Sequence, residues 1–188
     1  MSKGWLIAVC LVLMVALLGA IGCDSHTPDE PEPTTDGTVS QPPEKTNFNL
    51  IFNYGVMARN KLDTFQGTYT KDMVIDPPIT VELSLSEEEM DSIHQKMVEI
   101  DFFNYPDNFS VSVPPDVPTG IRTPYPSYYF KVEYNSKIKE LWWNDQIVYK
   151  DYKDERADRL SELVSLIRSI VESKEEYKKL PEPRSAYL

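Results

Sequence analysis

The sequence is short of the residues that most often carry metal-dependent or covalent chemistry. Its 188 residues include two cysteines and two histidines, and only His94 lies in the part that is patterned as a folded domain. His94 could share a helix face with Glu88 and Asp91, but a zinc site needs three or four converging ligands. A Ser-His-Asp triad would have to draw His94 from the middle of a predicted helix. The sequence also lacks HExxH, GxSxG, GxGxxG and phosphate-loop motifs, so it predicts no metal, no cofactor and no catalytic residue.

Positive charge is scarce as well. Lys and Arg number 19 against 30 Asp and Glu, which gives a formal net charge of −11. An acidic surface repels phosphate backbones and anionic lipid headgroups, so nucleic acid is not an expected partner. If residues 1–22 are removed, Cys23 is the one cysteine left, and the domain must fold without a disulfide.

The first 22 residues have the pattern of a signal peptide. Lys3 precedes an unbroken apolar run at residues 5–18, WLIAVCLVLMVALL, which has the length of a signal-peptide core. A spanning helix usually needs about 20 apolar residues with positive flanks. Here Asp24 and further acids follow, and no Lys or Arg occurs before Lys45. A membrane-spanning anchor is therefore the less favoured alternative.

The residues around Cys23 distinguish a lipoprotein signal from an ordinary secretory signal. Ala20-Ile21-Gly22-Cys23 resembles the bacterial lipobox, in which small residues precede a cysteine that receives diacylglycerol. A single exported thiol is a liability unless it has a use, and acylation supplies one. We therefore expect Cys23 to be lipidated and the protein to be held at the extracytoplasmic face of the cell membrane. The alternative is a cysteine that ends an uncleaved anchor.

Residues 23–46 are predicted to form a disordered tether. After Cys23 this segment is rich in Pro, Thr, Asp and Glu, has no aromatic residue and has only Val39 as an aliphatic. Such a composition buries too little apolar surface to offset the entropy of ordering. His26 lies here and is expected to be solvated. Residues 47–180 are then predicted as one domain, and residues 181–188 as a C-terminal tail.

Hydrophobic periodicity in residues 47–180 predicts an α+β fold with a small antiparallel sheet covered by two helices. Ser86 and Glu89 match a capping box that begins a helix over residues 87–101, and apolar spacing from Asp154 predicts a second helix that fades at residues 174–179. Asn135-Ser136 predicts a hairpin turn. Strands are expected at residues 48–56, at 62–65 with 68–74 as one return strand, at 79–83, at 128–134 and at 137–143, with a break at residues 76–78 and an irregular loop at 108–126.

Two stretches and a tryptophan pair are candidates for a binding surface. Residues 59–72 and 119–125 mix charged and aromatic side chains, which are common anchors at interfaces. Trp142 and Trp143 are neighbours on a predicted strand, so one should be buried and the other exposed, where it could stack on a sugar or a peptide. The competing interpretation is that Tyr and Thr only favour strands and that Phe65 and Tyr69 are core residues. The candidates are Arg59, Tyr69, Lys71, Asp72, Arg122, Trp142 and Trp143.

Two longer stretches, NKLDTFQGTYTKDMV and PPITVELSLSEEEMDSIHQKMVEIDFFNYP, resemble small lipoproteins of Gram-positive spore-forming bacteria. The resemblance implies a lipid-anchored outer-surface protein and brings no catalytic residues with it. We expect a non-enzymatic binding or interaction domain with a protein or cell-wall ligand. The alternative is a hydrolase that uses two carboxylates on a wall or exported polymer. The sequence specifies neither the ligand nor the oligomeric state.

Overall fold

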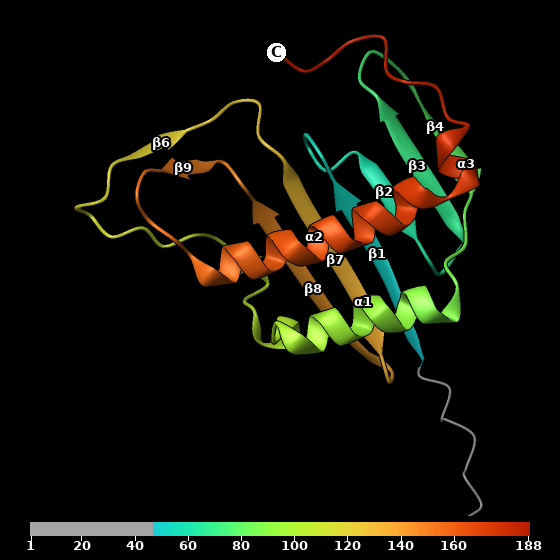
Figure 1. The fold of residues 1–188 in the computed structure, drawn as a ribbon, viewed down its shortest axis with the longest axis horizontal. Coiled ribbons are helices and arrows are strands. Elements are labelled where there is room, and N and C mark those ends of the chain that lie inside the picture. The colour runs from blue at the N-terminus through green and yellow to red at the C-terminus, as the bar shows by residue number, and fades with distance from the viewer. Residues whose placement is uncertain (1–46) are drawn as a thin grey trace, which may run out of the picture. The chain divides into compact units, whose positions relative to one another are not determined.

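The computed structural model describes residues 47–188, which form an α+β fold (Figure 1). The main sheet has seven strands in the order β4-β3-β2-β1-β7-β8-β5, and a second sheet pairs β6 with β9. The strands are β1 (Phe48–Tyr54), β2 (Asn60–Asp63), β3 (Thr68–Met73), β4 (Asp76–Glu82), β5 (Asn108–Phe109), β6 (Thr119–Ile121), β7 (Ser127–Tyr134), β8 (Lys137–Asn144) and β9 (Ile147–Tyr149). The helices are α1 (Glu87–Glu99), the 3-10 turn η1 (Phe102–Asn104), α2 (Glu155–Ser173) and α3 (Glu175–Lys178). The predicted signal peptide, the lipobox and the tether lie outside the described residues.

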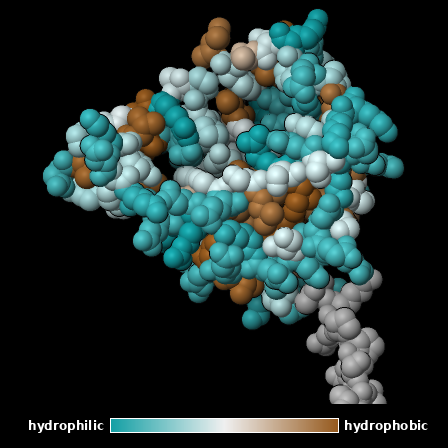
Figure 2. All heavy atoms as spheres, viewed as in Figure 1, coloured by the Kyte–Doolittle hydropathy of each residue, from teal (hydrophilic) through white to brown (hydrophobic). Residues whose placement is uncertain are grey.

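Both long helices lie across the same face of the main sheet, as expected (Figure 1). In β1, Phe48, Leu50 and Phe52 point into the core under the helices, and the residues between them are partly exposed. Seen from this side, hydrophilic side chains cover most of the surface, and hydrophobic ones show between α1 and α2 (Figure 2). The predicted class is therefore confirmed. The sheet differs from the small antiparallel sheet that was expected, because it has seven strands and β5 pairs in parallel with β8.

The predicted return strand is two strands. β2 pairs with both β1 and β3, and a turn at residues 64–67 separates β2 from β3. Gly67 has φ of 62°, a left-handed conformation that costs glycine little, and the Asp63 carboxylate accepts a hydrogen bond from the Gln66 N–H at 3.2 Å. The expected break at residues 76–78 is instead the start of β4, an edge strand, where Pro77 and Pro78 are tolerated because one side needs no ladder partner.

The helix starts follow their sequence signals. The Ser86 hydroxyl accepts from the Glu89 N–H at 3.3 Å and the Glu89 carboxylate accepts from the Ser86 N–H at 2.7 Å, which confirms the capping box. Asp154 caps α2 by accepting from two backbone N–H groups at 3.0 Å each. After α1 the chain turns at Asp101, whose φ is 60°, and Phe102 then fills the core. Both predicted helices are confirmed within a residue or two of their ends.

The second half of the domain holds the elements that the sequence did not predict. The β7-β8 hairpin turns at Asn135 and Ser136, both with positive φ, as expected. The supposed irregular loop at residues 108–126 contains β5 and β6, and β9 follows β8. These short strands pair with partners far along the chain, so they carry no local period that a sequence can reveal.

Residues 181–188, predicted as a tail, lie against the β3-β4 side of the sheet (Figure 1). Glu182 pairs with Lys71, Arg184 pairs with Asp76, and Tyr187 donates a hydrogen bond to Asp72. The described residues 47–188 belong to one compact unit. No helix between residues 47 and 188 combines the length and the apolar character that a bilayer-spanning segment needs.

Candidate functional site

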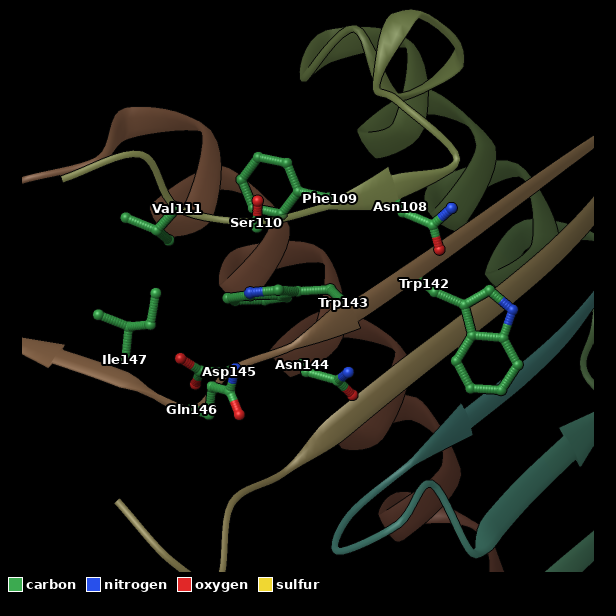
Figure 3. Close-up of a pocket in the computed structure, with 10 residues that line it drawn as sticks. All are labelled: Asn108, Phe109, Ser110, Val111, Trp142, Trp143, Asn144, Asp145, Gln146 and Ile147. Carbon is green, nitrogen blue, oxygen red and sulfur yellow. The ribbon is translucent and has the colours of Figure 1, made fainter. Parts of the chain in front are cut away.

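Trp142 and Trp143 divide between the two faces of β8. Side chains alternate along a strand, and Trp143 is 2% exposed in the core, where its ring lies 5.0 Å from Tyr128 and 5.8 Å from Phe109. Trp142 is 46% exposed on the face that the helices leave uncovered. Figure 3 shows the two indoles pointing away from each other. The prediction of one buried and one exposed indole is confirmed.

Tyr129 supports the exposed indole. It lies directly opposite Trp142 in the β7-β8 ladder, and the two ring centroids are 4.5 Å apart at an interplanar angle of 33°. Aromatic pairs at this separation attract each other beyond simple area burial. Burial raises the pKa of Tyr129, and the nearby Glu140 carboxylate raises it further. The pair therefore forms an uncharged aromatic platform on the face of the sheet that the helices leave uncovered.

A first hollow lies beside the platform, between β5 and the end of β8 (Figure 3). It has a volume of about 240 Å³, and its polar groups include three side-chain amides, each with donors and an acceptor. β5 forms one wall because Asn108 pairs with Trp142 in the sheet. The backbone N–H of Trp142 also donates to the Asp107 carbonyl at 2.7 Å. The lining residues are Asn108, Phe109, Ser110, Val111, Trp142, Trp143, Asn144, Asp145, Gln146 and Ile147.

A second hollow borders the same indole. Its volume is about 440 Å³, and Trp142 and Asn144 line both hollows. Most of its other lining is apolar or aromatic and comes from the turn after β1 and the loop before β7. These residues are Val56, Met57, Thr123, Pro124, Tyr125 and Ser127. We call Trp142, Tyr129 and the linings of these two hollows the Trp142 surface.

Arg122 holds one acid of this surface in place. Its guanidinium forms an ion pair with the Asp145 carboxylate and also donates to the Asp145 carbonyl at 2.9 Å. Burial raises the pKa of Asp145, and the Arg122 charge partly offsets that rise. Arg122 is thus a predicted candidate that the structure brings to the Trp142 surface, through its contact with Asp145.

The other candidates form a separate group at β3. Tyr69 is buried, and its hydroxyl lies 2.7 Å from that of Tyr54, so it is a core residue, as the competing interpretation predicted, and not part of a surface. The same interpretation is wrong for Phe65, which is 43% exposed. Burial also raises the pKa of Tyr54 to about 12. Arg59 and Asp72 both contact Tyr187, and Lys71 is buried. Three strands separate β3 from β8, which puts the groups about 19 Å apart at ~4.8 Å per strand.

Sequence reasoning did not find the amides and apolar residues that complete the Trp142 surface. Asn108, Asn144 and Gln146 meet because β5 joins the sheet in parallel beside β8, which is a pairing between distant segments. Met57 and Tyr125 meet because Val56 bridges to Pro126. The one available signal was the proline-rich loop at residues 108–126, since loops of that length are often functional.

His94 lies in an aromatic setting. Its ring packs against Tyr134 at 4.3 Å and Phe48 at 5.1 Å, and burial lowers its pKa. Within residues 47–188, no group of three or more His, Cys, Asp or Glu side chains is arranged to hold a metal ion.

In comparisons with known proteins, no family model and no curated protein matches the chain.

Proposed function

We propose that the protein is a lipid-anchored, non-enzymatic binding module on the extracytoplasmic face of the cell membrane, and that the Trp142 surface binds glycan chains of the cell envelope. The observation that carries the proposal is an indole left 46% exposed on a supporting tyrosine, in a residue that lines two hollows. An exposed aromatic side chain beside a hollow has the composition of a ligand contact, with an apolar platform and polar groups around it.

The chemistry of the surface suits a sugar polymer. A sugar ring offers an apolar face of C–H groups, which stacks on a flat indole, and hydroxyls around its rim. Asn108, Asn144 and Gln146 supply donors and acceptors for such hydroxyls in the first hollow. A few polar groups around an apolar platform are the usual composition of a ligand site. Because Trp142 and Asn144 line both hollows, we expect a chain bound at the indole to reach into them.

The anchor part of the proposal depends on the sequence. Ala20-Ile21-Gly22-Cys23 supports acylation of Cys23, and the segment after it supports a tether that holds the domain away from the bilayer. The resemblance to small lipoproteins supports the same placement. In this proposal the acyl chains provide the contact with the membrane, and the acidic domain provides none.

The competing function is a carboxylate-based hydrolase that acts on wall or exported polymer. Glycoside hydrolysis needs two carboxyl groups facing one substrate, about 5 to 9.5 Å apart. Among the described residues that line the two hollows, Asp145 is the one carboxylate, and it is paired with Arg122. This arrangement favours binding over hydrolysis. Release of sugar fragments by the purified protein would support the hydrolase instead.

The test compares two exposed residues of β8 on the same face. Residues 47–188 contain the whole hydrophobic core, so this fragment is suitable for titration calorimetry with soluble oligosaccharides from bacterial cell wall. We expect Trp142→Ala to weaken binding about 30-fold, the cost of losing a central aromatic anchor. Ile138→Ala is the matched control, because Ile138 is 60% exposed and lines neither hollow. An equal loss in both variants, or no binding by the wild type, would contradict the proposal.

A further inference from the structure

Lys71 carries a charge into the helix-covered side of the sheet. Tyr69, Lys71 and Met73 alternate with partly exposed residues along β3, so the lysine shares a face with the core. Its side chain is 6% exposed, and its ammonium lies 5.1 Å from the ring centroid of Tyr177. A buried cation is costly unless an anion compensates it. A carboxylate or an equivalent anion at this point therefore stabilises the fold.

Glu182 supplies that anion from the C-terminal segment, residues 181–188. Its Oε1 lies 3.0 Å from the Lys71 ammonium and is the one carboxylate oxygen within residues 47–188 that pairs with it. The Glu182 side chain is itself 84% exposed, so a carboxylate from solvent can approach the Lys71 ammonium from the side where Glu182 now lies. A cavity of about 250 Å³ opens here, and Tyr54, Asp72, Arg168, Glu172, Tyr177 and Pro183 are among its lining residues.

Most of the contacts that hold the C-terminal segment in this place are weak ones. Besides Glu182, Arg184 pairs with Asp76, and the Tyr187 hydroxyl donates to Asp72 at 2.6 Å. None of residues 181–188 belongs to the hydrophobic core. The Arg184 and Tyr187 contacts have partly or fully solvent-exposed partners and contribute little to stability, so the Lys71–Glu182 pair carries most of the cost of releasing the segment. Its departure would expose Lys71 without a partner.

We propose that the Lys71 cavity is a binding site for acidic peptides in which a glutamate stands between prolines, and that the C-terminal segment occupies this site in cis. Glu182 lies between Pro181 and Pro183, and Glu182, Pro183 and Tyr187 form one wall of the cavity, so the segment shows which chemistry fits against Lys71. When Glu182 is displaced, the cations Lys71 and Arg168 and the anions Asp72 and Glu172 remain around the cavity. The carboxylate of an incoming peptide then replaces the negative charge that Glu182 supplied. Proline-flanked peptides lose little conformational entropy on binding.

This site is distinct from the Trp142 indole, although Val56 lines both the Lys71 cavity and the second hollow. Its ligand is a protein segment and not a sugar, and the two sites can be tested separately.

The test uses the peptide acetyl-LPEPRSAYL in trans and follows binding by NMR. In the wild type the tethered segment competes at a high effective concentration, so the peptide should bind weakly. A chain that ends at Leu180 keeps the whole core, and we expect it to bind the peptide at least about tenfold more tightly than the full chain does. Glu182→Gln should tighten binding about fivefold, because an ion pair with an exposed partner is lost.

Three controls make the test specific. Glu176→Gln changes the same charge on an exposed side chain of α3 and should leave binding unchanged. The peptide acetyl-LPQPRSAYL has no glutamate and should not bind the chain that ends at Leu180. Lys71→Met should abolish binding of the glutamate peptide.

Two results would overturn the proposal. One is equal binding of the glutamate and glutamine peptides, which would mean that Lys71 does not read a carboxylate. The other is the absence of any binding to the chain that ends at Leu180.

Discussion

At the scale of single residues, the two adjacent tryptophans are expected to have different roles: Trp143 stabilises the core, and Trp142 is the proposed ligand contact. Trp143 is enclosed by Phe109 and Tyr128, whereas Trp142 touches Tyr129 and solvent. We predict that Trp143→Ala lowers the free energy of unfolding by about 3 to 5 kcal/mol, the usual cost of emptying an aromatic core position. Trp142→Ala should cost about 1 kcal/mol, the scale of one aromatic pair. Urea denaturation measures both, and similar losses would show that the assignment of faces is wrong.

His94 gives the second residue-scale prediction, which concerns pH. Burial against Phe48 and Tyr134 lowers its pKa from the usual 6.5, and Asp91 only partly opposes this. The unfolded chain then takes up a proton at a higher pH than the folded chain does. Stability is therefore present above pH ~6.5 and is lost as the pH falls below it, down to the lowered pKa. We predict that the wild type loses more stability between pH 7 and pH 5 than His94→Phe does.

The measurement is a series of urea melts across that range. The variant keeps an aromatic ring at position 94, so the difference between the two pH profiles isolates the imidazole. Parallel profiles would mean that His94 titrates alike in the folded and unfolded chains.

At the scale of elements, the start of α1 depends on one side chain. Ser86 satisfies an orphan N–H of the first turn and positions Glu89 for the reciprocal bond. We predict that Ser86→Ala lowers the free energy of unfolding by about 1 kcal/mol. Ser92→Ala, in the exposed middle of the same helix, should cost nothing, because alanine is the better helix former. Equal effects of the two changes in thermal melts would contradict the capping role.

The same elements show what a single sequence can predict. α1 and the β7-β8 hairpin were predictable because their signals are local: a serine three residues before a glutamate, and a two-residue Asn-Ser turn. β5 and β9 were not, because each is a short strand whose partner lies far along the chain. The proposed Trp142 surface was likewise predictable only in part. The opposite orientation of Trp142 and Trp143 follows from strand alternation, but the amides of Asn108 and Gln146 come together only through the fold.

At the scale of the whole molecule, the proposal joins a domain to a membrane anchor through Cys23. We predict that mass spectrometry of the protein from its native membrane finds a chain that begins at Cys23 and carries diacylglycerol. Cys23→Ser should move the protein out of the membrane fraction, and Ser25→Ala, two residues away, should not. An unmodified thiol at Cys23, or a leader that is still attached, would contradict the anchor.

The central claim is that a glycan lies on the exposed indole. Residues 47–188 contain two tryptophans, so the indole N–H signals of Trp142 and Trp143 can be followed separately by NMR while a soluble cell-wall oligosaccharide is added. We predict that the Trp142 signal shifts and saturates with ligand concentration, while the Trp143 signal barely moves. If the Trp142 signal stays in place up to millimolar oligosaccharide, the protein does not bind wall glycan through this surface.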